Sequence, residues 1–116
     1  MPEIAIFAPT NNISLKMKLI EINIKHIFDL CKRYKVKSLS VFGSILTDRF
    51  NDGSDVDLLV NFNDDVTYHT YADNFFGLYE GLRNLLGRKI DLVDEGAISN
   101  KYFKEEIDET KHLIYG

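Results

Sequence analysis

The stretch from residue 55 to residue 62, DVDLLVNF, constrains the fold of this chain more than any other. Its Val, Leu and Phe residues are typical of a β-strand, and turn residues bound it on both sides. Because side chains alternate between the two faces of a strand, Asp55 and Asp57 are predicted to share one face. The other face then carries Val56, Leu58, Val60 and Phe62 and packs into the core. We therefore expect a sheet with one apolar face and one face that bears two carboxylates.

The rest of the chain supplies further elements in a simple order. Strands are also predicted over residues 36–44 and 88–94, and a helix over residues 70–87, where Gly77 and Gly81 each cost about 1 kcal/mol. A first helix is expected from Ser14, as its N-cap, into the basic residues 31–35. A last helix is marked by Tyr102, Phe103, Ile107, Thr110 and Ile114. This order predicts an α/β or α+β domain with a small sheet flanked by helices.

Bulk properties restrict the class of protein. The 116 residues fit one domain, which we place at residues 15–116 after an irregular extension at 1–14. The single cysteine, Cys31, excludes an intramolecular disulfide and favours a cytoplasmic location, and its place on an apolar helix stripe favours core packing. No signal-peptide pattern and no apolar run of roughly 18 residues is present, so no membrane association is expected. The net charge of −4 argues against direct binding to nucleic acid.

The two aspartates of the 55–62 strand indicate a metal site. Parallel carboxylates repel each other unless a cation lies between them, and Mg²⁺ prefers such hard oxygen ligands. The next predicted strand carries Asp91, and if the two strands are neighbours, three carboxylates converge. Two metal ions about 3.5–4 Å apart could then support an in-line displacement at phosphorus. Asp91 would serve as a metal ligand and as the base for the incoming hydroxyl.

A Gly-Ser pair precedes this strand and predicts a phosphate site. Gly43 lets a phosphate approach the backbone closely, and Ser44 opens a turn whose free N–H groups favour anions. Arg49, in the following loop, could reach a phosphate. The joint pattern G-S-x10-D-x-D, followed by a third strand with an acid, is far more specific than any of its parts.

Other candidate sites are weaker. A calcium-binding EF-hand loop is excluded because Val56 or Leu59 would occupy its fifth position. The three histidines have no metal-ligand spacing; they are His26, His69 and His112. Asp94 and Glu95 are interpreted as loop charges, and residues 104–111, KEEIDETK, as a solvated helix face.

Residues 43–60, GSILTDRFNDGSDVDLLV, resemble the signature of the polymerase β-like nucleotidyltransferase superfamily. Within it, the chain is similar to the minimal nucleotidyltransferases, and the likeness extends from about residue 15 through YADNFF, LLGRKIDLV and NKYF. The resemblance implies a mixed sheet flanked by helices, two Mg²⁺ ions and ATP as the donor. It also assigns Asp55, Asp57 and Asp91 to the carboxylate triad.

The same resemblance implies a partner. Minimal nucleotidyltransferases are commonly encoded beside a HEPN-type RNase toxin, and they act as antitoxins by transferring AMP from ATP to a tyrosine of that toxin. We therefore expect a Mg²⁺-dependent protein adenylyltransferase. Two alternatives stay open: an antitoxin that neutralises its partner by binding alone, and a nucleotidyltransferase with a small-molecule acceptor. Oligomeric state and acceptor residue are not predicted.

Overall fold

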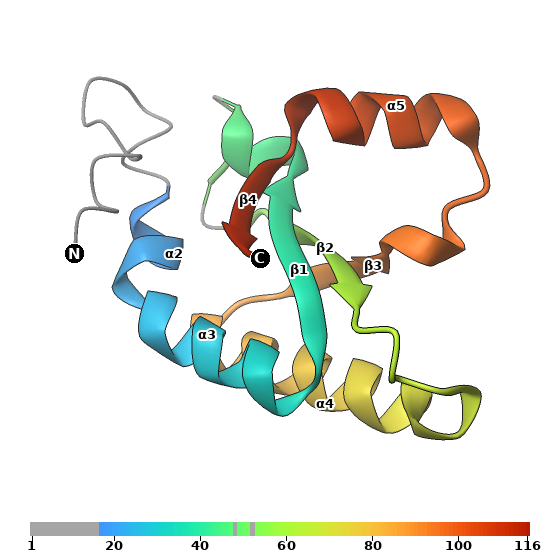
Figure 1. Ribbon diagram of the computed structural model, residues 1–116. Coiled ribbons are helices and arrows are strands. Elements are labelled where there is room, and N and C mark those ends of the chain that lie inside the picture. The colour runs from blue at the N-terminus through green and yellow to red at the C-terminus, as the bar shows by residue number, and fades with distance from the viewer. Residues whose placement is uncertain (1–16, 48, 52) are drawn as a thin grey trace.

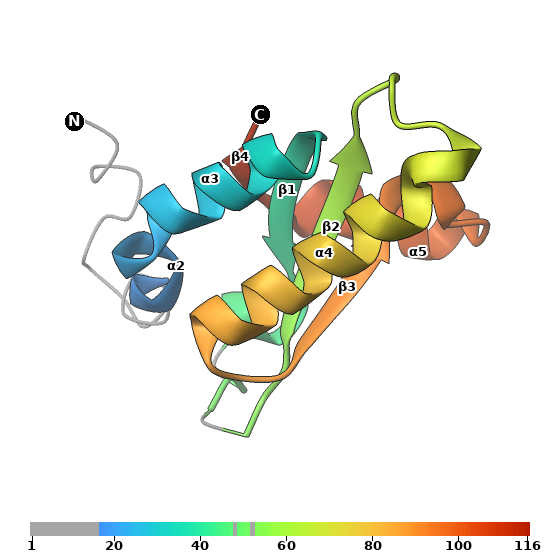
Figure 2. The same ribbon diagram turned by 90° about the horizontal axis from the view of Figure 1, so that it is seen from below.

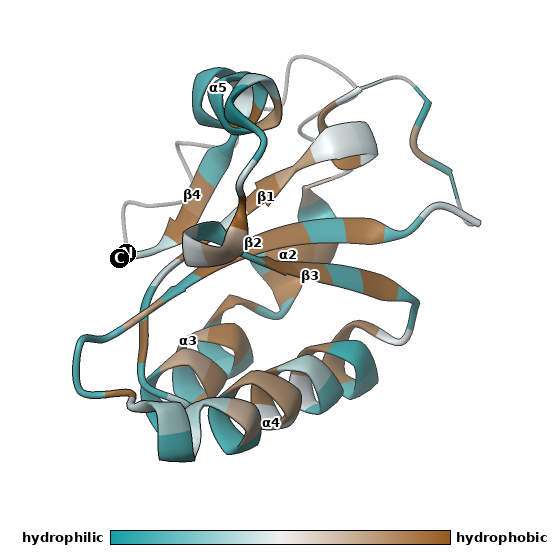
Figure 3. Ribbon diagram, turned by 90° about the vertical axis from the view of Figure 1, so that its right-hand side faces the viewer, coloured by the Kyte–Doolittle hydropathy of each residue, from teal (hydrophilic) through white to brown (hydrophobic). Residues whose placement is uncertain are grey.

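A four-stranded sheet lies between two layers of helices in the computed structural model (Figures 1 and 3). The structure describes residues 17–47, 49–51 and 53–116. The strands have the order β3-β2-β1-β4, with β1 antiparallel to β2 and β4, and β2 parallel to β3. The predicted mixed sheet flanked by helices is thereby confirmed. The elements are α2 (Lys18–Ile22), α3 (Ile24–Arg33), β1 (Val36–Phe42), η2 (Gly43–Leu46), β2 (Val56–Phe62), α4 (Tyr68–Leu86), β3 (Ile90–Asp94), η3 (Glu95–Ala97), α5 (Lys101–Thr110) and β4 (His112–Tyr115).

The two faces of the sheet have different roles. Helices α3 and α4 cover one face, with their apolar sides turned towards the strands, and α5 lies on the opposite face (Figure 3). Val56, Leu58 and Val60 are buried in the main core, beneath α3 and α4, as the strand alternation predicts. On the opposite face a smaller cluster joins Leu59 to Ile107 of α5. The alternation therefore leaves this second face only partly covered and available for polar side chains.

Helices α3 and α4 run side by side beneath the sheet (Figure 2), and two glycines of α4 permit their close approach. A Cβ atom at Gly77 would overlap the ring of Tyr34, and one at Gly81 would lie 2.6 Å from Leu30 Cδ2. The two glycines lower the intrinsic stability of α4, and in return they allow α3 and α4 to pack tightly against each other.

The predicted first helix is broken in two. Asn23 ends α2 and precedes α3, and its side-chain amide donates a hydrogen bond of 2.8 Å to the carbonyl of Leu19. Such local side-chain bonds compete with regular helical geometry, which explains the break. The apolar stripe persists across it, since Ile20 and Ile27 are both buried. The N-cap predicted at Ser14 and the extension at 1–14 lie outside the described residues.

The predicted last helix is too long. Helix α5 ends at Thr110, and residues 112–115 form β4, so the expectation that Ile114 is helical is wrong. Lys111 adopts extended backbone angles, and β4 then pairs with β1, with Ser40 opposite Leu113. The pairing of β4 satisfies backbone groups along the edge of β1 that faces away from β2, a long-range gain that outweighs local helix periodicity.

Cys31 is fully buried in the main core, as predicted. Burial raises the pKa of its thiol to about 12, so the native protein holds the unreactive thiol form. No helix in the described part of the chain has the length and apolarity to span a membrane.

We predict that Gly77→Ala lowers the free energy of unfolding by about 1–3 kcal/mol, because the new methyl group forces the Tyr34 ring out of its place. Helix propensity alone predicts the opposite, a gain of about 1 kcal/mol. Gly81→Ala is the matched control, since the end of the Leu30 side chain can rotate away, and it should cost less. Denaturant unfolding measures both, and a stabilised Gly77→Ala variant would contradict the packing described.

Candidate active site

The sheet brings the predicted carboxylates to one place. Asp57 on β2 and Asp91 on β3 are direct partners in the parallel ladder. Asp55 precedes β2 by one residue and shares the face of Asp57 by alternation. This is the face opposite the main core, since Val56 and Leu58 point into that core. The three carboxylates therefore gather on the side of the sheet where α5 lies.

The three carboxylates are close enough to interact electrostatically. Burial raises the pKa of the Asp57 carboxyl, and the neighbouring charges of Asp91 and Asp55 raise it further. A hydrogen bond from the backbone N–H of Ser44 acts in the opposite direction and stabilises the carboxylate. The net direction is upward, so the cluster holds negative charge that its surroundings do not fully offset.

The Gly-Ser turn lies directly on Asp57. Gly43 begins the short helix η2 with a positive φ of 76°, and a Cβ at this position would overlap the Asp57 carboxylate oxygen. Only glycine satisfies both the backbone angle and the contact. The next residue, Ser44, supplies the N–H that Asp57 accepts. The structure thus unites Gly43 and Ser44 with the carboxylates.

A cavity of about 690 Å³ opens beside this turn. Gly43, Ser44 and the exposed Arg49 line one side of it, so the three residues predicted to bind phosphate share one space. Helix α5 lines the other side with Phe103, Glu106, Ile107 and Thr110, and His112 of β4 joins them. The charged residues 105, 106, 108 and 109 are exposed, as the interpretation of a solvated helix face predicts, and Ile107 is the buried residue among them. The pair Phe103 and Ile107, four residues apart, was the available signal of an inward face.

The donor chemistry fits a divalent cation. Asp55, Asp57 and Asp91 supply hard oxygen atoms, and no ion pair with a cationic side chain offsets their charge among the described residues. In that same part of the chain, no three acidic, histidine or cysteine side chains form a ready-made metal cage. Mg²⁺ does not need one, because it commonly binds one or two carboxylates and completes its sphere with water and phosphate oxygens.

The acids at the end of β3 have structural roles. Asp94 Oδ1 accepts the backbone N–H of Gly96 at 2.9 Å, and Oδ2 accepts the Tyr71 hydroxyl at 2.6 Å. Burial and this bond to Asp94 raise the pKa of the Tyr71 hydroxyl. Glu95 pairs with Lys104 of α5 at 3.6 Å. Both Asp94 oxygens are thus engaged in holding η3 and α4 in place.

Comparison with known proteins identifies the family. The polymerase beta nucleotidyltransferase model matches residues 23–116. The Methanocaldococcus jannaschii protein named "Putative protein adenylyltransferase MJ0128" is 44% identical over 91 residues, which cover 78% of this chain and 87% of that protein. Protein adenylyltransferase MntA of Thermococcus cleftensis is 31% identical over 88 residues, 76% of this chain and 85% of its own.

Solved structures share the fold. A chain of a toxin–antitoxin complex with AMP-PNP superposes with a TM-score of 0.61 at 21% identity, covering 81% of this chain and 73% of that one. A chain of the tri-AMPylated Shewanella oneidensis HEPN toxin in complex with MNT antitoxin gives 0.56 at 20% identity, covering 83% and 71%. The chain belongs to the polymerase β nucleotidyltransferase family. The resemblance to the minimal nucleotidyltransferases and the prediction of a nucleotidyltransferase enzyme are confirmed.

We predict that Gly43→Ala costs more stability than Gly87→Ala. Both glycines have positive φ, 76° and 65°, so each substitution carries a backbone cost of about 1–2 kcal/mol. Nothing lies within 4 Å of a Cβ at Gly87, whereas a Cβ at Gly43 must also displace the Asp57 carboxylate. Denaturant unfolding of the two variants isolates this contact, and equal losses would show that the carboxylate moves freely.

We also predict that Asp57→Asn stabilises the metal-free protein. A raised pKa means that the ionised carboxyl opposes folding, so its contribution to stability falls as pH rises through that pKa. The neutral amide removes the repulsion and keeps the acceptor for Ser44, a gain of no more than about 1 kcal/mol in a partly solvated site. Thermal unfolding at neutral pH with a chelator measures this.

Asp64→Asn, in the exposed turn after β2, is the control for this measurement and should leave stability unchanged. Added Mg²⁺ should raise the melting temperature of the wild type and of Asp64→Asn, and not that of Asp57→Asn. A less stable Asp57→Asn protein in the absence of metal would contradict the repulsion inferred here.

Proposed function

We propose that this protein is a Mg²⁺-dependent adenylyltransferase that transfers AMP from ATP to a tyrosine hydroxyl of a HEPN-type toxin and so acts as its antitoxin. The observation that carries the proposal is the contact of the Gly43–Ser44 turn with Asp57, beside Asp91. It combines an anion-binding turn with a carboxylate cluster, the two halves that nucleotidyl transfer needs. The named adenylyltransferase relatives and the toxin–antitoxin neighbours support the choice of donor and acceptor.

Each residue has a role in this proposal. Asp55 and Asp57 would hold both Mg²⁺ ions, and Asp91 would be a ligand of one of them. Bound Mg²⁺ would supply Lewis-acid stabilisation of the charge on the triphosphate. Gly43 and Ser44 hold the triphosphate at the turn that begins η2, and the Arg49 guanidinium neutralises part of its charge.

The transfer step follows from this arrangement. The acceptor oxygen forms a bond to the α-phosphorus of ATP while the bond from that phosphorus to the bridging oxygen breaks. Pyrophosphate leaves with the electron pair, and the proton of the acceptor hydroxyl passes to the Asp91 carboxylate. The AMP group adds a negative charge and bulk to the toxin, which opposes the binding of RNA at an RNase site.

The proposal also covers the domain that carries the reaction, its cellular location and its contact with nucleic acid. A single catalytic domain over residues 15–116 carries the chemistry, and a cytoplasmic location suits its ATP donor and its lone cysteine. We expect no direct contact with nucleic acid, given the net charge of −4.

The decisive experiment incubates the protein with its HEPN partner, ATP and Mg²⁺ and measures the intact mass of the partner. We expect an added AMP group with the wild type and with Asp64→Asn. Asp57→Asn should slow transfer by about a thousandfold, since it removes several kcal/mol of charge stabilisation.

Transfer by Asp57→Asn at the wild-type rate would refute the proposed site. A stable complex with no mass gain, in which the toxin is still inhibited, would establish neutralisation by binding alone. Transfer to an added small molecule but not to the partner would establish the other acceptor class.

A further inference from the structure

The cavity beside the Gly43–Ser44 turn has an aromatic wall. Phe103 of α5 meets Phe42 of β1 edge to face, with ring centroids 6.3 Å apart and an angle of 74° between the planes. Phe42 and Ile107 are almost fully buried at 8% and 2% exposure, whereas Phe103 keeps 40% of its surface exposed. All three line the cavity. A large apolar ring that remains accessible inside a cavity is available for contact with a ligand.

We propose that this wall is the nucleobase subsite of the donor nucleotide and that Phe103 stacks against the base. The inference rests on the proposed function and deepens it, because it names the group that fixes the non-reacting end of the donor. The reacting phosphates must lie at Gly43 and Ser44, which contact the carboxylate Asp57. The base must then extend along the same cavity, away from that turn.

The cavity matches a nucleotide in size and in the distribution of its chemistry. Its volume of about 690 Å³ lies within the range of roughly 300–1,000 Å³ of small-molecule sites. One side offers the Gly43–Ser44 turn and the Arg49 guanidinium, which suits phosphates, and the other offers the rings of Phe42 and Phe103, which suit a flat heterocycle. A single nucleotide can therefore fill both sides of the cavity, with its phosphates at one side and its base at the other.

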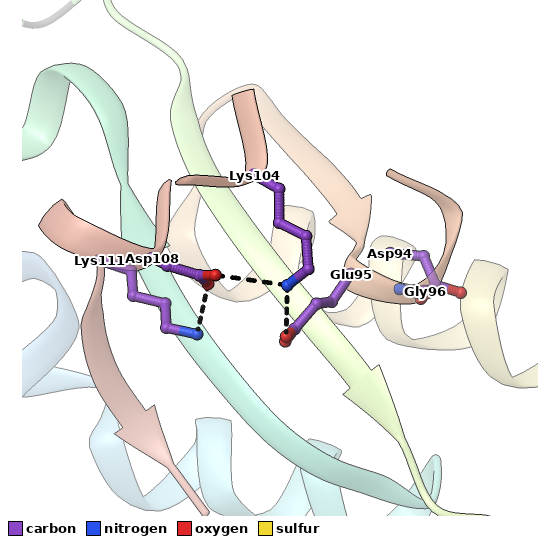
Figure 4. Close-up of polar contacts among 6 residues, drawn as sticks. All are labelled: Asp94, Glu95, Gly96, Lys104, Asp108 and Lys111. Carbon is purple, nitrogen blue, oxygen red and sulfur yellow. Dashed lines mark hydrogen bonds and ion pairs between the residues drawn. The ribbon is translucent and has the colours of Figure 1, made fainter. Parts of the chain in front are cut away.

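Helix α5 is fixed in a way that leaves Phe103 free to make this contact. Lys104 pairs with Glu95 at 3.6 Å and with Asp108 at 3.3 Å, and Asp108 pairs with Lys111 at 3.2 Å (Figure 4). The Lys104–Glu95 pair ties α5 to η3, and the two pairs of Asp108 lie within α5 and its C-cap residue Lys111, along a neighbouring face of the helix. The face that carries Phe103 and Ile107 is not engaged in them, so Ile107 anchors the helix and Phe103 lines the cavity.

The neighbouring residue is a matched control. Tyr102 stands beside Phe103 on α5, is 76% exposed and does not line the cavity. Its removal perturbs the same helix without touching the proposed subsite. Inorganic triphosphate is the matched ligand, because it has the phosphates of ATP and no base.

The experiment measures two affinities in the presence of Mg²⁺, that of a non-hydrolysable ATP analogue and that of inorganic triphosphate as its competitor. Phe103→Ala should weaken the ATP analogue on the order of tenfold and leave inorganic triphosphate within about twofold. Tyr102→Ala should leave both unchanged, and Phe103→Tyr should restore wild-type affinity. Phe103→Leu, which keeps apolar packing against Phe42, should still bind the analogue more weakly than wild type and serves if Phe103→Ala does not fold.

The outcomes separate this inference from the proposed function. Unchanged affinity of Phe103→Ala for the ATP analogue overturns the subsite, as does an equal loss of affinity for inorganic triphosphate. Unchanged ATP affinity with a raised KM for the toxin also overturns it and assigns the wall to the acceptor. Absence of AMP transfer by the wild type refutes the proposed function, whereas transfer by the wild type with unaltered Phe103→Ala affinity refutes the subsite alone.

Discussion

The contact between Gly43 and Asp57 sets the arrangement of this protein's polar face. It brings the end of β1 and the start of η2 against a carboxylate of β2, and the left-handed backbone of Gly43 turns the Ser44 N–H towards that carboxylate. The parallel pairing of β2 with β3 adds Asp91 from the other side. A partly buried acid thus has a hydrogen-bond donor on one flank and like charges on the other. This balance leaves uncompensated negative charge at a site that the fold itself forms.

The protein can stay folded with such a site because the two faces of the sheet have different roles. The face beneath α3 and α4 contains the main core, and close contacts at Gly77 and Gly81 fit those helices together. Hydrophobic burial there supplies stability that does not depend on the opposite face. The α5 face can therefore retain repelling carboxylates and an open cavity. Stability and chemistry depend on different sets of side chains of the same strands.

The sequence predicted the parts of this structure that local patterns determine. Strand alternation placed Asp55 and Asp57 on one face and Val56 and Leu58 in the core, because period-two burial is visible in eight residues. The catalytic roles of the acids stay predictions. The strand β4 was missed because its pairing with β1 is long-range, and the break at Asn23 because one side-chain hydrogen bond outweighed the periodicity. The cavity beside α5 was not predicted, because Phe103 and Ile107 stand among charged residues that face solvent.

Helix α5 is held against the sheet by few contacts, and this affects how easily it opens. Ile107 is its only buried side chain, and the Lys104–Glu95 ion pair that joins it to η3 is partly exposed to solvent. Local opening of a helix costs free energy in proportion to what it buries, so α5 should exchange its amide hydrogens sooner than α3 or α4, at energies well below global unfolding. The cavity wall can therefore open and close while the sheet stays folded. Local opening of α5 releases one buried isoleucine and leaves the main core intact.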